Sequence, residues 1–260
     1  MNLELNDKVV LVTGGARGIG EAIVHGLSRE GATPVVVDKD ERAALALQRT
    51  LAGAGMRCES IIADLTDPAA CADVVADALR RTQRLDALVN NAGVNDRAGL
   101  RDGSVDAFVT SLHRNLVHCY AMTRASLDAL TASCGSIVNI ASKVALTGQG
   151  GTSGYAASKG GLLALTREWA VDLAPLGIRV NAVVPAEVMT PLYRQWLDSF
   201  PEPETKLGEI VQHIPLGHRM TTTDEIASAV LFLLSARASH ITAQHIHVDG
   251  GYVHLDRALT

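Results

Sequence analysis

The chain is poor in aromatic residues and cysteine, and it has no large excess of charge of either sign. Phe, Trp and Tyr make up 3% of its 260 residues, and the formal net charge is −5. Without a block of basic residues the chain offers little to a phosphate backbone, so we expect no nucleic-acid partner. No apolar run reaches the about 20 residues that a membrane-spanning helix needs, so we expect no membrane insertion.

The four cysteines stand far apart, at Cys58, Cys71, Cys119 and Cys134. They form no Cys-x-x-Cys pair and no cluster with histidine at zinc-site spacing, so we expect free thiols and no metal. The stretch 1–15 lacks the cationic segment and long apolar run of a secretory signal. We therefore expect a cytoplasmic protein.

Short apolar runs rich in β-branched residues alternate with longer segments of helical pattern. Most runs are apolar on successive residues, which is typical of strands covered on both faces of a parallel sheet. The runs predict strands at 8–13, 33–38, 58–63, 85–90, 135–140, 178–184 and 244–249. The segments between them predict helices at 18–30, 41–53, 68–82, 104–131, 154–175 and 223–236.

This alternation predicts a single α/β domain over residues 1–260, with helices on both faces of a doubly wound parallel sheet of about seven strands. Residues 186–221 interrupt the alternation, because they carry several prolines and mixed polarity. We expect them to form a small lobe that contacts the substrate.

A glycine-rich turn, TGGARGIG at 13–20, follows the first predicted strand. Gly14, Gly18 and Gly20 suit a sharp turn, close approach of the backbone to a pyrophosphate and tight packing of the next helix. The helix that begins near Gly18 would direct its free N–H groups and positive dipole end at phosphate. Placed between a strand and a helix, the turn predicts dinucleotide binding.

Asp38 ends the second predicted strand, eighteen residues after Gly20. A carboxylate there can accept hydrogen bonds from both adenosine ribose hydroxyls and repels a 2′-phosphate, which favours NAD over NADP. The cation of Lys39 offsets part of that repulsion, so use of NADP stays open. The other interpretation of Asp38 is a carboxylate that caps a loop.

A tyrosine and a lysine four residues apart, Tyr155 and Lys159, lie in SGYAASKGG at 153–161. On a helix the two share a face, and taken alone they are an ordinary surface pair. In a catalytic interpretation the ammonium stabilises the phenolate, because a free tyrosine gives up its proton only near pH ~10. Other parts of the sequence favour the catalytic interpretation.

Three motifs in this order, TGGARGIG, NNAG (90–93) and YAASK (155–159), resemble those of the short-chain dehydrogenase/reductase family. The resemblance covers nearly the whole chain and includes four further motifs: ADLTD at 63–67, RNL at 114–116, NIAS at 139–142 and VDGG at 248–251. It implies a Rossmann-type sheet and an oxidoreductase that uses a nicotinamide cofactor.

The resemblance implies a catalytic tetrad of Asn115, Ser142, Tyr155 and Lys159. In it Tyr155 is the general base, and Lys159 favours its phenolate and binds the nicotinamide ribose. Ser142 orients the substrate, and Asn115 holds a water in a proton relay. The alternative interpretations are a mid-helix asparagine that bonds the backbone and a serine that caps a loop.

The same resemblance assigns the contacts with the cofactor. Asp64 is expected at the adenine amino group, and the turn after the fourth strand at the adenosine ribose. The expected set is Gly14, Arg17, Gly18, Ile19, Gly20, Asp38, Asp64, Leu65, Asn91, Ala92, Gly93, Tyr155, Lys159, Pro185, Val188 and Thr190.

The chain departs from the family pattern after the sixth strand, where Pro185-Ala186 stands in place of Pro-Gly. The added Cβ predicts a turn that avoids a positive φ at Ala186. Glu187 follows, and a carboxylate near the nicotinamide needs polar partners. A polyhydroxylated substrate would supply two of them. The alternative is that Glu187 points to solvent or to a surface arginine.

Polar and aromatic residues gather in the loops expected around the tetrad. Aromatic faces suit the C–H surfaces of a sugar and amides suit its hydroxyls, although Tyr193 and Trp196 have the alternative of anchoring the lobe to the core. The expected substrate contacts are Asn95, Ser142, Gln149, Tyr155, Glu187, Tyr193 and Trp196.

Within the family, the stretches NNAGVND, KVALTGQGGTSGYAASKGG and VVPAEVMTPLYRQW are similar in particular to those of bacterial L-fucose dehydrogenases. This similarity implies oxidation of the C1 hydroxyl of L-fucose, or of a related L- or 6-deoxy aldose, to the lactone. Two other functions stay open. One is a family member that acts on a ketone, acyl or steroid substrate, and the other is a regulatory protein that senses the cofactor without turnover.

The resemblance also implies a homotetramer. The helix at 104–131 and the helix that carries Tyr155 would form one interface, and the last strand and tail a second. We expect the tail from Tyr252 to pack on a neighbouring subunit near its substrate pocket, with His254 and Arg257 as contacts.

Overall fold

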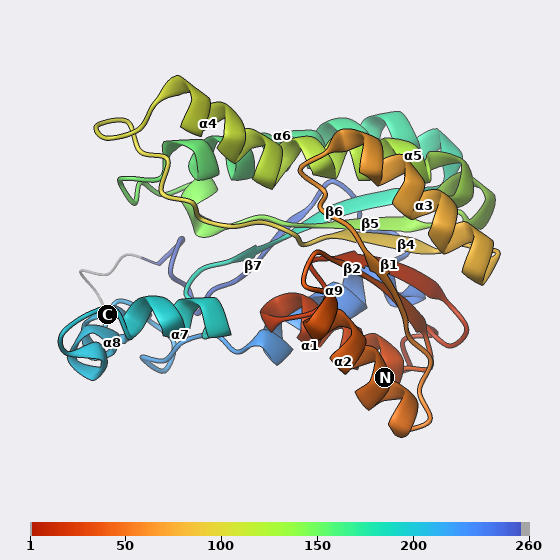
Figure 1. Cartoon of the computed structure of the whole chain (residues 1–260), viewed down its shortest axis with the longest axis horizontal. Coiled ribbons are helices and arrows are strands. Elements are labelled where there is room, and N and C mark those ends of the chain that lie inside the picture. Colours follow the sequence, from red (N-terminus) through yellow and green to blue (C-terminus); the bar gives the residue numbers. More distant parts are fainter. Residues whose placement is uncertain (1, 256–260) are drawn as a thin grey trace.

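Seven parallel strands form one sheet in the order β3-β2-β1-β4-β5-β6-β7 (Figure 1). The structure is a computed structural model, and it describes residues 2–255. Every strand expected from the sequence forms, with ends within two residues of the prediction. The strands are β1 (Val9–Thr13), β2 (Thr33–Asp38), β3 (Glu59–Ile62), β4 (Ala87–Asn90), β5 (Ser136–Ile140), β6 (Arg179–Pro185) and β7 (His245–Val248).

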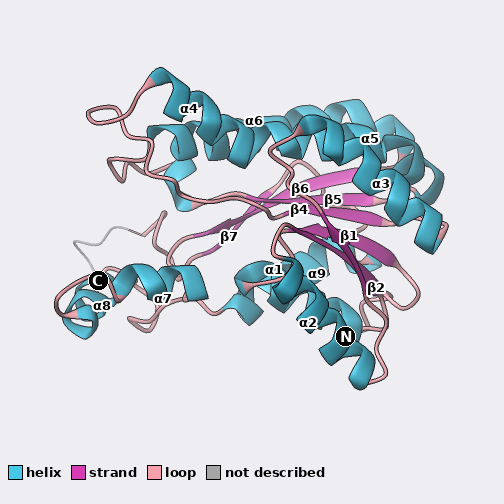
Figure 2. Cartoon of the chain, in the orientation of Figure 1, coloured by secondary structure: helices cyan, strands magenta, loops and turns pink. Residues whose placement is uncertain are grey.

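Helices cover both faces of this sheet, as Figure 2 shows. The α-helices are α1 (Gly18–Arg29), α2 (Glu41–Gly53), α3 (Pro68–Thr82), α4 (Val105–Leu112), α5 (His118–Ser133), α6 (Ser153–Leu173), α7 (Pro191–Leu197), α8 (Pro203–Val211) and α9 (Thr223–Leu234). The prediction of one helix over 104–131 was incomplete, because a π-helical turn, His113–Val117, separates α4 from α5. No helix within residues 2–255 is long and apolar enough to cross a membrane.

Successive residues of the central strands enter two different hydrophobic cores. In β1, Val10 and Val12 pack with α1, α2 and α9 on one face, whereas Val9 and Leu11 pack with α3, α5 and α6 on the other. Side chains alternate across a strand, so both sets are buried only if both faces are covered. This explains why the strands read as continuous apolar runs.

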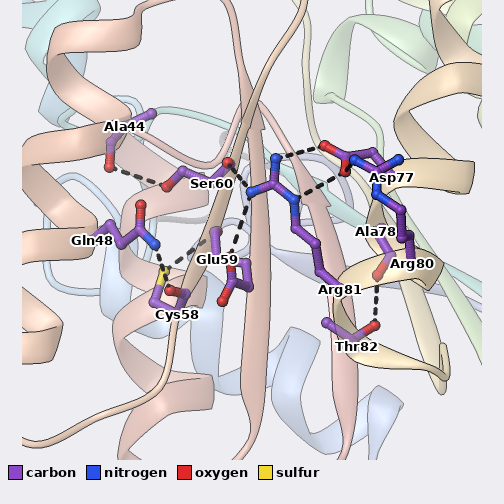
Figure 3. Close-up of polar contacts among 10 residues, drawn as sticks. All are labelled: Ala44, Gln48, Cys58, Glu59, Ser60, Asp77, Ala78, Arg80, Arg81 and Thr82. Atoms are coloured by element: carbon purple, nitrogen blue, oxygen red, sulfur yellow. Dashed lines mark hydrogen bonds and ion pairs between the residues drawn. The ribbon is translucent and has the colours of Figure 1, made fainter.

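β3 is an edge strand of the sheet, and the side chain of Arg81 from α3 binds along it (Figure 3). Arg81 Nη1 donates to the carbonyl oxygen of Ser60 at 3.1 Å and lies 3.5 Å from Oε2 of Glu59. The other side of its guanidinium binds Asp77, with 2.7 Å between Nη2 and Oδ2. A charged side chain bound along an edge strand discourages pairing with another chain.

Residues 186–221 form a separate small unit next to β7, built from α7 and α8 (Figure 1). Each helix begins with a proline at its first turn, where the missing N–H costs no hydrogen bond. An isolated β-bridge between Val188 and Thr221 joins the first and last parts of this unit. Because β6 ends at Pro185 and the unit starts at the next residue, the unit begins at the carboxyl edge of the sheet.

Candidate active site

The carboxyl ends of the parallel strands meet at one edge of the sheet. The chain runs from β1 outward to β3 and then crosses to β4, on the other side of β1. In doubly wound sheets, ligands bind outside the strand ends at such a reversal. The loops after β1, β4, β5 and β6 therefore frame the candidate site.

The glycine-rich turn after β1 has the shape that a pyrophosphate requires. Gly14 has a φ of +60°, and a Cβ there would lie 2.9 Å from Cα of Ala92. A Cβ on Gly20 would collide with the carbonyl oxygen of Gly14, so glycine lets α1 pack directly on the turn. Arg17, the N-cap of α1, makes no side-chain bond to the first turn of the helix. The N–H groups of that turn are thus available to an anion, and the turn fits a dinucleotide.

The turn after β4 holds the glycine-rich turn in place. Asn91 Nδ2 donates to the carbonyl oxygens of Thr13 and Gly14, at 2.9 Å each. In the other direction, Thr13 Oγ1 accepts from the N–H groups of Asn91 and Ala92. Asn91 therefore ties the end of β4 to the start of the glycine-rich turn.

Asp38 stands at the end of β2 beside the glycine-rich turn. Its Oδ2 accepts from the N–H of Ala16 at 3.1 Å, and its Oδ1 accepts from the N–H of Asp40 at 3.0 Å. Asp40 in turn binds the guanidinium of Arg17, with 2.6 Å between Oδ2 and Nη2. The hydrogen bond to Asp40 is the main cause of the raised pKa of Arg17. The one cation of the turn is thus tied to a carboxylate.

Asp64 and Leu65 follow β3. Asp64 Oδ1 accepts from the N–H and the hydroxyl of Thr66, and the backbone bond is the main cause of the lowered pKa of Asp64. The ammonium of Lys39 lies 4.0 Å from its Oδ2. Asp64 is exposed and Leu65 is buried, so of this pair only the carboxylate of Asp64 faces solvent.

The structure brings Asn115 and Lys159 together at Gly93. An added Cβ on Gly93 would lie 2.9 Å from Oδ1 of Asn115 and 3.3 Å from Nζ of Lys159. Asn115 Oδ1 accepts from the N–H of Val94 at 2.7 Å, and Lys159 Nζ donates to the carbonyl oxygen of Ile140 at 2.8 Å. Both side chains are buried. The ammonium is therefore fixed between the ends of β4 and β5.

Tyr155 lies one helical turn before Lys159 on α6. The ammonium nitrogen is 5.6 Å from the centre of its ring, and the tyrosine is half-buried. Ser142 follows β5 and caps the short helix Lys143–Ala145, with its Oγ accepting from the N–H of Val144 at 3.4 Å. The spacing of thirteen residues between Ser142 and Tyr155 thus connects a strand end to a helix start.

A buried histidine close to Lys159 was not predicted from the sequence. The imidazole Nε2 of His118 lies 3.1 Å from the carbonyl oxygen of Arg114, and its side chain is almost completely buried. Burial, with a smaller contribution from the charge of Lys159, lowers the pKa of His118 to about 4. At neutral pH, His118 therefore places an uncharged group beside the ammonium.

The segment after β6 closes over the glycine-rich turn. Pro185 is the last residue of β6, and Val188 is 5% exposed. Thr190 caps α7 by accepting from the N–H of Tyr193, and its Cγ2 lies 3.4 Å from the point where Gly18 would carry a Cβ. Ala186 does not have a positive φ, which confirms the prediction that the turn after β6 avoids one at this residue.

Glu187 has protein partners that the sequence did not suggest. The ammonium of Lys143 donates to its Oε1, and the hydroxyl of Tyr193 donates to its Oε2 at 2.7 Å. The ring of Tyr252 lies 4.1 Å from the same ammonium nitrogen, and the rings of Tyr193 and Trp196 meet edge to face at 5.1 Å. Glu187 therefore points neither to solvent nor to a surface arginine. The available signal was Lys143, a charged residue directly after Ser142.

Two expected substrate contacts lie farther from these residues. Gln149 is exposed in a glycine-rich loop and lines a hollow of about 310 Å³ formed by residues 144–153 and Ala156. Asn95 is exposed, and its Oδ1 accepts from the N–H of Arg97 at 3.3 Å. Both residues occupy mouth loops, and neither joins the buried polar group at Glu187.

The last described residues return to the site and to β7. The ring of His254 lies 4.4 Å from that of His247 on β7, and Tyr252 reaches Lys143 within the same chain. Arg257 lies outside the described residues. No group of three or more His, Cys, Asp or Glu side chains suited to a metal ion occurs in the part that the structure describes.

Comparisons with known proteins agree with this geometry. A family model described as Enoyl-(Acyl carrier protein) reductase matches residues 14–253. L-fucose dehydrogenase of Bos taurus is 37% identical over 245 residues, which are 94% of this chain and 88% of that protein. Cyclopentanol dehydrogenase of Comamonas testosteroni is 37% identical over 249 residues, 95% of this chain and 98% of that protein.

Two solved structures have the same fold over nearly the whole chain. The crystal structure of Cj0485 dehydrogenase has a TM-score of 0.94 and 42% identity, covering 100% of this chain and 99% of that one. The aldohexose dehydrogenase of Thermoplasma acidophilum has a TM-score of 0.89 and 31% identity, covering 99% and 98%. Together with the glycine-rich turn and the Tyr155–Lys159 pair, these similarities establish that the chain is an oxidoreductase of the short-chain dehydrogenase/reductase family.

Proposed function

We propose that this protein is an NAD-dependent dehydrogenase that oxidises the C1 hydroxyl of an aldose to the lactone. L-fucose or a related L- or 6-deoxy sugar is the proposed substrate. The observation that carries the chemistry is the position of Tyr155, one turn before a buried Lys159 whose ammonium is fixed by the carbonyl oxygen of Ile140. Such a fixed positive charge favours the phenolate that a base needs.

In the proposed reaction, the Tyr155 phenolate accepts the proton of the C1 hydroxyl, and Ser142 orients the same oxygen. A bound nicotinamide supplies the acceptor for the hydride that leaves C1. Lys159 binds the ribose hydroxyls as well as favouring the phenolate. Asn115 Oδ1 accepts from the N–H of Val94, and its second lone pair is proposed to bind a water of the proton relay. Because the ring oxygen is bonded to C1, the oxidised product is a lactone.

The support for a sugar substrate comes from relatives and from the polarity of the site. An L-fucose dehydrogenase and an aldohexose dehydrogenase are among the similar proteins. Lys143 directly follows Ser142, and it donates to Glu187, which also accepts from Tyr193 in the segment after β6. An apolar substrate would leave these groups without water and without new partners, which is costly.

The preference for NAD rests on Asp38 and on the ion pair of Arg17 with Asp40. A 2′-phosphate would meet the carboxylate at the end of β2, and the guanidinium that would bind it is already paired. NADP is the less favoured cofactor on this account.

We also propose that the protein is a homotetramer. Light scattering of the purified protein measures its molar mass and tests this proposal.

A second candidate is a secondary alcohol without other hydroxyls, because a cyclopentanol dehydrogenase is as similar as the L-fucose dehydrogenase. A ketone, acyl or steroid substrate belongs to the same alternative. The test is an NAD-reduction assay over L-fucose, L-galactose, D-arabinose, L-rhamnose, cyclopentanol and a steroid alcohol. Aldose oxidation with the highest kcat/KM supports the proposal, and activity confined to the other alcohols rejects the sugar assignment.

A further inference from the structure

A buried ion pair lies beside the tetrad, and the proposed reaction does not require it. The side chains of Lys143 and Glu187 are 9% and 13% exposed, and they bind each other between the loops that follow β5 and β6. Tyr193 and Tyr252 complete this group. We call these four residues the Lys143–Glu187 cluster.

Stability alone is a weak reason for such a pair. Removing two charges from water costs about as much as their attraction returns, and apolar replacements of buried pairs are often neutral or stabilising. The tyrosine ring over the ammonium and the phenol on the carboxylate lower the cost of keeping the charges buried. The cluster therefore keeps two buried charged side chains and a phenol next to Ser142.

The cluster is polar and carries no net charge. One ammonium faces one carboxylate, and burial together with the charge of Glu187 raises the pKa of Tyr193 above its usual range, so this phenol stays neutral. A neutral polar wall offers no net attraction to an anionic substrate and disfavours an apolar one. It suits an uncharged substrate that brings its own donors and acceptors.

The pair also has hydrogen-bonding capacity left. An ammonium has three N–H donors, and a carboxylate has about four acceptor positions. Among the described residues, Lys143 donates one hydrogen bond, to Glu187, and Glu187 accepts two. A hydroxyl that accepts from Lys143 and a neighbouring hydroxyl that donates to Glu187 would use this capacity together.

We propose that Lys143 and Glu187 determine specificity by binding two adjacent hydroxyls of an uncharged polyhydroxylated substrate. Lys143 donates to one hydroxyl, and Glu187 accepts from the next. This inference rests on the proposed sugar dehydrogenase activity and deepens it, because it names the groups of the substrate that are recognised.

The test is a double substitution, Lys143→Met with Glu187→Gln, assayed on an aldose that the wild type oxidises and on its deoxy analogues. Changing both residues leaves no unpaired buried charge, and the amide still accepts from Tyr193. The wild type should prefer the parent sugar over at least one deoxy analogue by about tenfold in kcat/KM. The double variant should lose about 10- to 100-fold on the parent, mainly through KM, and should oxidise that analogue and the parent within about threefold of each other.

A matched control exchanges an exposed ion pair of the same unit. Lys206→Met with Glu209→Gln removes a pair of 2.9 Å on α8 and should keep the wild-type discrimination. Unchanged NADH binding by fluorescence titration verifies that the double variant is folded. If it does not fold, the single variant Glu187→Gln replaces it. That variant leaves one positive charge, so its kcat/KM for the uronate of the aldose should rise at least about threefold relative to the parent sugar.

Each outcome has a defined meaning. A double variant that discriminates against every deoxy analogue as the wild type does overturns the inference and leaves the proposed function intact. So does an unchanged uronate ratio in Glu187→Gln. If the wild type oxidises no aldose, the proposed function and this inference fail together.

Discussion

The guanidinium of Arg17 is bound by the carboxylate of Asp40, with 2.6 Å between Nη2 and Oδ2. Asp40 also caps α2 by accepting from the N–H of Ala43 at 2.9 Å. Asp40→Ser keeps a capping side chain and releases the arginine. We expect the ratio of kcat/KM with NADP to that with NAD to rise about three- to tenfold, since a factor of ten is about 1.4 kcal/mol.

Two further variants serve as comparisons for the NADP-to-NAD ratio of kcat/KM. Asp38→Ser removes the carboxylate that would meet a 2′-phosphate, so it should raise the same ratio by about tenfold or more. Asp67→Ser exchanges the N-cap of α3 and should leave the ratio unchanged. A ratio that stays constant in both Asp38→Ser and Asp40→Ser would contradict the proposed basis of cofactor preference.

Gly20→Ala should abolish cofactor binding, because the new Cβ would collide with the carbonyl oxygen of Gly14. The turn must open to accept it, which moves the N–H groups at the start of α1. NADH titration followed by fluorescence measures the loss. Gly208→Ala on α8 is the control, since a Cβ there meets no atom within 4 Å, and it should bind NADH as the wild type does. Equal binding by both variants would show that the close approach at Gly20 is not required.

Tyr155→Phe should lower kcat by about 10²- to 10⁴-fold, because it removes the proposed base and leaves the ring in place. Steady-state assays at saturating NAD measure the effect, and NADH binding should persist. Tyr120→Phe changes an exposed tyrosine on α5 and should keep full activity. Retained turnover in Tyr155→Phe would contradict the assignment of Tyr155 as the general base.

Asn115→Leu should destabilise the protein by about 1–3 kcal/mol, because the N–H of Val94 loses its acceptor inside the fold. Urea unfolding measures this change. Asn95→Ala removes an exposed amide from the same loop region and should alter the free energy of unfolding by less than about 0.5 kcal/mol. Similar stabilities for the two variants would mean that the Asn115 bond is not maintained in solution.

His118 should make the fold sensitive to mild acid. Its pKa is about 4 in the folded state, against the usual 6.5, so below pH 6.5 the unfolded chain binds a proton that the folded chain does not. Stability from this group is complete above pH 6.5 and falls as the pH drops toward 4, by about 2 kcal/mol at pH 5. His118→Gln should remove this part of the loss between pH 7 and 5 in urea unfolding. An equal loss in both proteins would exclude the histidine as its source.

The sheet could be predicted because local sequence and final environment agree. Strands such as Val9–Thr13 are buried on both faces and read as continuous apolar runs, and the glycine positions follow from backbone constraints. The partners of Glu187 could not be predicted in the same way. Lys143 and Glu187 are 44 residues apart, and their contact depends on the packing of two loops at neighbouring strand ends.

The π-helical turn was missed for a related reason. Its residues, His113–Val117, have ordinary helical composition, so the hydrophobic pattern continues through it. The feature that distinguishes the turn is a tertiary contact, because Asn115 accepts a hydrogen bond from the N–H of Val94 on the facing loop. Loop residues such as Gln149 carry no local sequence signal for the direction of their side chains, so their contacts with a substrate stay a prediction.

The π-helical turn also changes the rotation of α5 about the helix axis relative to α4. An α-helix advances about 100° per residue, so one extra residue in a turn rotates everything after it by roughly that angle. α4, which exposes Val105 and Val109, and α5, which buries Cys119 and Met122, can therefore present different faces to the same neighbours. Deleting one residue from 113–117 would restore a regular helix and would direct either Asn115 or the buried face of α5 away from the sheet.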